Sequence, residues 1–235
     1  MAEPILNAVV EPIARQSFLG EVAYQRLKDI IIRGAFPPNE KMTVRSVATA
    51  LGVSTTPARD AVNRLLSDGA LVNAGPKTVV LPVLTMDSLE EITATRTALE
   101  GLAAERAAQF IEKDDIAELE RLQKIINKAL DESNYREVLR ANYDFHFLIY
   151  RRSNWPRLVA MIEIQWLRIG PSLNDLYPDF ALTRKGVSNH MAAISAFKRK
   201  DASGARKAVE QDIGDGFQRL SALVRSRAEA AGKAP

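Results

Sequence analysis

Apolar positions follow two different patterns along this 235-residue chain, and the change falls near residue 83. In the first part, short stretches with helical spacing are interrupted by Gly and Pro. An amphipathic helix is predicted over 18–36, and two shorter helices over 43–53 and 55–71, because apolar residues recur there three or four positions apart. Gly52 lies between the last two helices and predicts a tight turn.

The segment LVNAGPKTVVLPV, residues 71–83, has a different pattern. Two β-prone runs flank the turn-forming sequence Asn73–Pro76, and this arrangement predicts a β-hairpin. Three short helices followed by a hairpin predict a winged helix-turn-helix with a two-stranded wing.

From Asp87 onward the helical period continues almost to the end of the chain, which predicts a long helix reaching to about Ile111. Polar and Pro positions break the remaining pattern into further helices. These are expected over 114–131, 134–151, 155–169, 181–199 and 202–228. The second part is therefore predicted to be an antiparallel bundle of about six to seven helices, and the whole protein to be mainly α.

The change of pattern divides the chain, and the charge follows the division. The predicted segments are an N-terminal arm (1–17), a winged helix-turn-helix (18–82), a linker (83–87), a helical domain (88–228) and a C-terminal tail (229–235). Residues 18–82 carry eight Lys or Arg and five Asp or Glu, whereas residues 83–235 carry 23 and 22. Because the excess of positive charge lies in the winged helix-turn-helix, an anionic partner is expected there.

Composition excludes several classes of protein. The chain has no cysteine, so disulfides, thiolate catalysis and cysteine-based metal clusters are excluded. No apolar run is long enough to span a bilayer, and the N-terminus has acidic residues where a secretory signal needs basic ones. We therefore expect a cytoplasmic protein without a membrane partner.

Five polar residues of the winged helix-turn-helix are candidates for DNA contacts. Arg59 lies in the first turns of the second helix of the motif, which enters the major groove in proteins of this fold. Arg45 begins the preceding helix, and Lys77 lies beside the tip of the hairpin. Thr55 and Thr56 offer hydroxyl and N–H groups to phosphates. The alternative is that all five are ordinary solvated surface residues.

A charged residue falls on the inward face of the first helix of the bundle. Leu89, Ile92, Leu99 and Ala103 form that face, and Arg96 lies on it. A buried guanidinium is costly unless an anion pairs with it. The anion could be a carboxylate of the protein or a carboxylate ligand held bidentately, or the side chain could tilt outward. The residues alone leave these possibilities open.

The chain has only two histidines, and both fall on inward faces of predicted helices. In RANYDFHFLIY, Asn142 and His146 are four residues apart, so both lie on one helix face. His190 shares a later apolar face with Ile194 and Phe197. A lone histidine on an apolar face is more often a core residue with a hydrogen-bonding neighbour than a ligand, so this pattern alone does not decide.

The run from Val22 to Val72 resembles the GntR family of bacterial transcription regulators. The matching features are Gly34-Ala35-Phe36-Pro37-Pro38 after the first helix, the LGVS turn, and TPARDAV at the start of the recognition helix. The resemblance implies that Arg45 and Arg59 contact DNA. Where the family usually has an Arg directly before Thr-Pro, this chain has Thr55, so the resemblance does not fix the sequence of the operator half-site.

The second part resembles the FCD effector domain of the FadR subfamily, from the R-x-x-L-E pattern at Arg96–Glu100 onward. The resemblance implies that Arg96 binds a small organic carboxylate effector, together with Asn142, His146 and His190. It also implies a site for a divalent transition metal, namely Zn, Ni or Mn. In metal-binding FCD domains an Asp-x-x-x-His pair joins two further histidines.

This chain departs from that ligand set at two positions. Asn142 stands at the Asp position and Asp212 at the final His position, so the expected ligands are Asn142, His146, His190 and Asp212. A metal-free pocket, in which the histidines hydrogen-bond the effector directly, remains the alternative.

Three functions are compatible with these features. The favoured one is a ligand-responsive transcription regulator, more often a repressor in this family and not an enzyme. One recognition helix buries too little area for useful specificity, so we expect a homodimer on palindromic double-stranded operator DNA. A metal-dependent hydrolase with a DNA-binding head would need a placed general base, for which no motif is visible. A constitutive DNA-binding protein would not need Arg96 and both histidines on inward faces.

Overall fold

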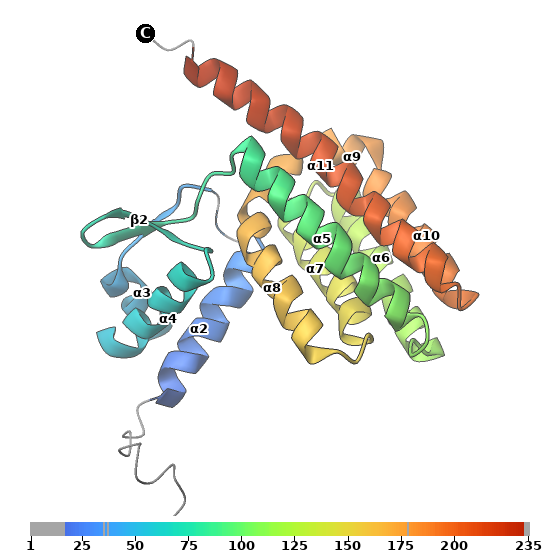
Figure 1. Ribbon diagram of the computed structural model, residues 1–235, viewed down its shortest axis with the longest axis horizontal. Coiled ribbons are helices and arrows are strands. Elements are labelled where there is room, and N and C mark those ends of the chain that lie inside the picture. Colours follow the sequence, from blue (N-terminus) through green and yellow to red (C-terminus); the bar gives the residue numbers. More distant parts are fainter. Residues whose placement is uncertain (1–16, 35, 37, 178, 233–235) are drawn as a thin grey trace, which may run out of the picture.

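The computed structural model describes residues 17–232 except 35, 37 and 178 (Figure 1). The predicted N-terminal arm lies outside these residues, apart from Ser17, and so do the last three residues of the predicted tail. The described elements form two groups, a winged-helix part of residues 17–80 and a helical bundle of residues 86–232.

The winged-helix part confirms the fold predicted from the sequence. It consists of α2 (Ser17–Ile32), β1 (Lys41–Met42), α3 (Val44–Leu51), α4 (Thr55–Ser67), β2 (Val72–Gly75) and β3 (Thr78–Val80). The β2–β3 hairpin is the predicted wing, but its turn lies at Pro76 and Lys77, slightly later than expected. The short strand β1 pairs with β3, so the antiparallel sheet has the order β1-β3-β2.

Local sequence explains how α3 and α4 are joined. Thr43 caps α3 by accepting a hydrogen bond from the backbone N–H of Ser46 at 3.0 Å. Gly52 ends α3 with a φ of 65°, a left-handed conformation that costs glycine little. The chain then turns within three residues and begins α4, whose first turn contains Thr55 and Thr56.

The bundle confirms the all-helical second part. Its elements are α5 (Met86–Ala107), α6 (Lys113–Asp131), α7 (Tyr135–Arg151), α8 (Pro156–Ile169), the 3-10 helix η1 (Gly170–Leu176), α9 (Asp179–Thr183), α10 (Lys185–Lys198) and α11 (Ala202–Gly232). The helix predicted over 181–199 is two helices, because Arg184 adopts a left-handed conformation with a φ of 51°. The long helix α11 packs along α5 (Figure 1).

The two parts are packed against each other, and α2 lies between α4 and the α8–η1 segment. Lys28 of α2 is 8% exposed and forms an ion pair of 2.7 Å with Glu163 of α8. Gly170 permits the closest approach, because a Cβ atom there would lie 2.8 Å from the backbone oxygen of Ile32. A side chain at position 170 would therefore push η1 away from α2.

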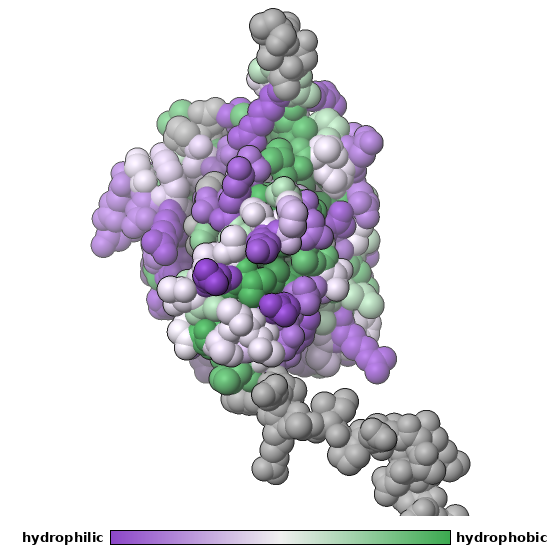
Figure 2. Space-filling model, turned by 90° about the vertical axis from the view of Figure 1, so that its left-hand side faces the viewer, coloured by the Kyte–Doolittle hydropathy of each residue, from purple (hydrophilic) through white to green (hydrophobic). Residues whose placement is uncertain are grey.

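The described part of the chain has no helix long and apolar enough to cross a membrane. The face on the side of the winged-helix part carries hydrophilic residues around smaller apolar areas (Figure 2).

Candidate functional site

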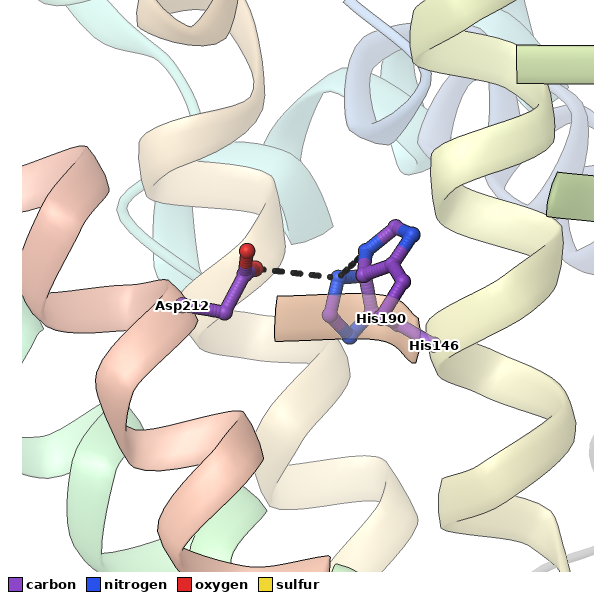
Figure 3. A group of neighbouring side chains, drawn as sticks. All are labelled: His146, His190 and Asp212. Carbon is purple, nitrogen blue, oxygen red and sulfur yellow. Dashed lines mark hydrogen bonds and ion pairs between the residues drawn. The ribbon is translucent and has the colours of Figure 1, made fainter. Parts of the chain in front are cut away.

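Three potential metal ligands converge inside the bundle. His146 of α7, His190 of α10 and Asp212 of α11 point toward one another from three helices (Figure 3). The two histidine Nε2 atoms are 3.2 Å apart, and His146 Nε2 lies 3.3 Å from Asp212 Oδ2. One potential ligand atom from each residue lies within 4.8 Å of the other two, so the three could hold a metal ion. We refer to His146, His190 and Asp212 as the three-residue site.

The helix that carries His146 has a clear beginning and a buried inner face. Asn134 caps α7 by accepting a hydrogen bond from the backbone N–H of Glu137 at 3.2 Å. On the inner face, the ring of Phe145 stacks on the imidazole of His190, with centroids 3.9 Å apart and planes 11° from parallel. Stacking of this kind holds the plane of the His190 ring parallel to that of Phe145.

Both histidines are shielded from water, with 2% of His146 and 3% of His190 exposed. Burial lowers the pKa of His190 to about 3, so this imidazole is neutral at physiological pH. Burial opposes ionisation of Asp212, but the adjacent imidazoles of His146 and His190 hold the pKa of its carboxyl below the usual value. The site therefore combines a neutral imidazole with an ionised carboxylate.

The other nitrogen of each imidazole faces a polar side chain of the surrounding helices. Gln123 of α6 places Oε1 2.7 Å from His190 Nδ1, and the hydroxyl of Tyr150 lies 3.1 Å from His146 Nδ1. Gln123 also donates from Nε2 to Asn127 Oδ1 at 2.9 Å. Each histidine is therefore held at both ring nitrogens.

Behind Tyr150 lies Glu100, a fully buried carboxylate on α5. Glu100 accepts hydrogen bonds from Arg96 Nε at 2.7 Å, from Arg96 Nη2 at 3.3 Å, from Trp166 Nε1 at 3.0 Å and from the Tyr150 hydroxyl. Burial and then the charge of Glu100 raise the pKa of Tyr150 well above its usual value. The phenol therefore keeps its proton.

Glu100 changes the interpretation of Arg96. Of the partners that the sequence left open for this guanidinium, the structure shows a carboxylate of the protein, one helical turn away on α5. Arg96 Nη1 makes no hydrogen bond with a described residue, and the side chain still lines the pocket beside the three-residue site. A role of Arg96 in effector binding stays a prediction.

A pocket opens beside the three-residue site, and we call it the bundle pocket. Its cavity has a volume of about 60 Å³, which is room for a few water molecules. Its polar wall includes Asn142, Arg96 and Arg184 in addition to the three-residue site. Its apolar wall consists of Ile126, Leu130, Val138, Leu139, Leu173, Leu176 and Val187. The four predicted ligands, Asn142 included, thus line one cavity.

Three residues around the histidines were missed in the sequence. Glu100 and Tyr150 each lie four positions after a residue that was singled out, Arg96 and His146, and this spacing places them on the same helix faces. That spacing was the signal that could have found them. Gln123 gives no such signal, because it lies 67 positions from His190 and is brought to it only by the packing of α6 against α10.

The five predicted DNA-contacting residues are all exposed on the winged-helix part. They are Arg45, Thr55, Thr56, Arg59 and Lys77. Among the described residues, the side chains of Arg45, Arg59 and Lys77 form no ion pair. By contrast, Lys28 pairs with Glu163, Arg33 with Asp144 and Arg64 with Glu21. The exposed cations at the recognition helix and the wing are thus available to an external anion.

Comparison with known families gives matches to both parts of the chain. Residues 19–77 match the family described as bacterial regulatory proteins, gntR family, and residues 91–215 match the FCD domain. These are families of transcriptional regulators, and neither is a family of enzymes.

Individual relatives agree with the family matches. The chain is 34% identical over 182 residues to the HTH-type transcriptional regulator McbR of Escherichia coli K12. This alignment covers 77% of the chain and 82% of McbR. It is 26% identical to the HTH-type transcriptional repressor GlaR of the same organism, over 62% of this chain and 72% of GlaR. The solved structure of E. coli McbR/YncC superposes with a TM-score of 0.78 at 31% identity, covering 89% of this chain and 98% of that one.

Proposed function

Because the chain belongs to the GntR family of transcription regulators and carries an FCD domain, we propose that it is a homodimeric, effector-responsive repressor acting in the cytoplasm. In this proposal residues 18–82 bind a palindromic operator in double-stranded DNA. Residues 88–228 bind a small carboxylate at a divalent metal ion, and residues 83–87 link the two. Repression is supported by the similarity to GlaR, a named repressor.

Exposure and charge support the DNA contacts. Arg59 lies near the start of α4, where a recognition helix presents side chains to base edges. Arg45 flanks it on α3, and Lys77 lies in the turn of the wing. Thr55 and Thr56 lie in the first turn of α4, whose N–H groups are favourable partners for a phosphate. In this proposal Arg59 reads bases, and the other four residues contact the backbone.

An apolar surface on α5 and α8 supports the homodimer. Leu102 of α5 and both Met161 and Ile164 of α8 are among the exposed large hydrophobic residues. The two helices are antiparallel neighbours, because Trp166 bonds to Glu100 and Arg168 to Glu91. Leu102, two residues after Glu100, and Ile164, two residues before Trp166, therefore lie at about the same level. Burial of this surface against a second copy would remove its contact with water.

The donor set of the three-residue site fits a transition metal. Ligand atoms around a tetrahedral zinc ion, each about 2.0–2.1 Å from it, lie about 3.3 Å apart. The separations of 3.2 and 3.3 Å at His146 Nε2 are close to this value, and all three ligand atoms lie within 4.8 Å of one another. Imidazole and carboxylate ligands suit Zn, Ni or Mn. His146, His190 and Asp212 would hold the ion, with Asn142 as a weaker or water-mediated fourth group.

The bundle pocket suits a small carboxylate. A bound divalent ion would supply a positive centre for the carboxylate, since Asp212 neutralises only one of its two charges. Arg96, which lines the pocket, adds a second positive charge. The remaining wall is largely apolar, which favours a carboxylate with a short hydrocarbon body over a neutral sugar.

The segment η1 supports a connection between the bundle pocket and DNA binding. Leu173 and Leu176 line the pocket, and Asn174 between them donates a hydrogen bond of 2.7 Å to the backbone oxygen of Gly34. Gly34 follows α2 of the winged-helix part. An effector that displaces η1 therefore changes the packing of α2, which is what coupling between two sites requires.

The observation that carries this proposal is the convergence of His146, His190 and Asp212 in a pocket whose wall also contacts α2. The test uses protein purified without chelator. Elemental analysis should find about one Zn, Ni or Mn ion per chain. A thermal-shift panel of organic acids should identify a stabilising carboxylate, and this carboxylate should change the affinity for operator fragments selected from random DNA. Protein without metal and without a stabilising carboxylate would refute the effector part of the proposal.

The metal-free pocket remains a second candidate because the three groups already contact one another. A proton on His146 Nε2 could bond to Asp212 Oδ2 at 3.3 Å, and the histidines would then bind the effector directly. A carboxylate that stabilises the chelator-treated and the metal-loaded protein equally would favour this candidate.

A further inference from the structure

The ring nitrogen that His190 turns away from the three-residue site faces an acceptor. Gln123 Oε1 lies 2.7 Å from His190 Nδ1, while Gln123 Nε2 donates to Asn127 Oδ1. An amide oxygen can accept a hydrogen bond but cannot donate one. The Nδ1 of His190 therefore carries a proton, and Nε2, which faces the site, is the nitrogen left to bind a metal ion.

The same reasoning applies to His146 through one more residue. Glu100 receives N–H groups from Arg96 and Trp166, which can only donate, so its carboxylate acts as the acceptor. The single hydroxyl proton of Tyr150 is therefore donated to Glu100. The Tyr150 oxygen then offers a lone pair to His146 Nδ1, 3.1 Å away, and that nitrogen must carry a proton.

From this geometry we infer that Gln123 and Tyr150 are positioning residues for a metal ion. Each accepts a hydrogen bond from the Nδ1–H of one histidine, so each histidine presents Nε2 to the same point. The two Nε2 atoms are 3.2 Å apart in a site shielded from water, a separation suited to two ligands of one cation. The inference rests on the metal part of the proposed function and identifies the residues that select the binding form of each imidazole.

Gln123 and Tyr150 differ in the neighbours that orient them as acceptors. Gln123 is oriented by a single neighbour, Asn127 on the same helix. Tyr150 is oriented by Glu100, which is itself held by two bonds from Arg96 and one from Trp166. Outer partners of this kind fix the orientation of a ligating histidine and raise its basicity, and their loss weakens metal binding by about 10- to 100-fold.

The proton positions can be measured directly in the metal-free protein. The chain has only two histidines, so nitrogen-15 NMR spectra of histidine-labelled protein contain two rings. We expect Nδ1 to carry a proton in both. An Nδ1 without a proton on either ring overturns the inference. This measurement gives its answer whether or not the protein binds a metal, so its failure is distinct from failure of the proposed function.

Zinc affinity, measured by competition with a chromophoric chelator, tests the role of Gln123. Gln123→Met removes the acceptor and should weaken zinc binding by about 10- to 100-fold. Gln123→Glu keeps an acceptor that cannot donate, so its affinity should stay close to that of the unaltered protein. If the side chain of Gln123 instead donated to His190, both variants would lose affinity alike, and the inference would be wrong.

Tyr150→Phe tests the second acceptor in the same assay, with an expected loss of about 10- to 100-fold. Tyr143→Phe is the matched control, because Tyr143 is a buried tyrosine on the same helix whose hydroxyl contacts neither imidazole. Equal zinc affinity of Tyr150→Phe and Tyr143→Phe would overturn the role of Tyr150. Circular dichroism of each variant separates this result from a failure to fold.

Discussion

The winged-helix part and the bundle pocket use arginine in opposite ways. Arg59 is exposed on α4 and has no acidic partner among the described residues, whereas Arg96 is 9% exposed and holds Glu100 through two hydrogen bonds. The first arrangement keeps a guanidinium available to an external anion. The second uses the guanidinium to satisfy a carboxylate of the protein itself.

This difference shows which of the two arginines is available to a partner from outside the protein. At the proposed DNA-binding surface, each exposed cation can be removed without leaving a buried charge unpaired. In the bundle, removal of Arg96 would leave Glu100 buried with fewer donors, at a cost of about 3–5 kcal/mol. A loss of effector binding in Arg96→Ala would therefore be difficult to separate from unfolding. The histidines offer a cleaner test of the pocket.

The largest effect is expected from the double substitution His146→Ala, His190→Ala. It removes two of the three strong donors, so metal content should fall from about one ion per chain to nearly none. Elemental analysis of protein purified without chelator measures this directly. Metal retained by the double variant would mean that the ion is bound elsewhere.

Asp212→Ala refines the same experiment. It removes the only carboxylate of the three-residue site, so metal affinity should also fall. If this variant keeps its metal, Asn142 contributes more than a weak fourth ligand, and the predicted ligand set is wrong at Asp212.

The next largest effect is expected for Arg59→Ala, which tests the exposed side of the comparison. A bidentate arginine contact to a base contributes about 1–3 kcal/mol, and a dimer would lose two of them, so specific binding should fall by at least about 30-fold. A gel shift with the selected operator measures this. Retained specific binding would show that the recognition surface is misplaced.

Arg64→Ala is the matched control on the same helix. Arg64 pairs with Glu21 and lies over the ring of Tyr24 at 3.8 Å, so it faces α2. Its loss should cost at most about 1 kcal/mol of stability and leave operator specificity unchanged.

The two regions also differ in how well the sequence predicts them. The order of elements in the winged-helix part could be predicted because Gly52, Pro57 and the wing turn act locally on the backbone. The inward faces of Arg96, His146 and His190 could be predicted from helical periodicity alone.

What periodicity cannot supply is the pairing between helices. The pairing of Glu100 with Arg96 could have been predicted, because the two residues are four positions apart on one helix. Gln123 and Trp166 were not, since their bonds to His190 and Glu100 depend on the packing of separate helices. The short strand β1 was missed for the same reason, because two residues gain strand geometry only from pairing with β3.

A smaller effect is expected for Lys77→Ala at the wing. Lys77 lies in the turn between β2 and β3, where a lysine can neutralise a phosphate without reading sequence. Affinity should fall by a similar factor for operator and random DNA. The plot of log affinity against log salt concentration should become less steep by about 1 for each chain. A loss confined to the operator would assign Lys77 to base recognition instead.

The smallest effect is expected for Asn174→Ala, which joins the two regions. The variant loses the 2.7 Å hydrogen bond to the Gly34 oxygen but keeps Leu173 and Leu176 on the pocket wall. Its free energy of unfolding should fall by about 0.5–1.5 kcal/mol. Metal content should not change, because Asn174 does not touch the three-residue site. The carboxylate changes the operator affinity of the unaltered protein by a certain factor. In the variant this factor should be closer to one, by about 2- to 30-fold. An unchanged ratio would mean that the coupling passes through another contact, of which the ion pair between Arg33 and Asp144 on α7 is the next to test.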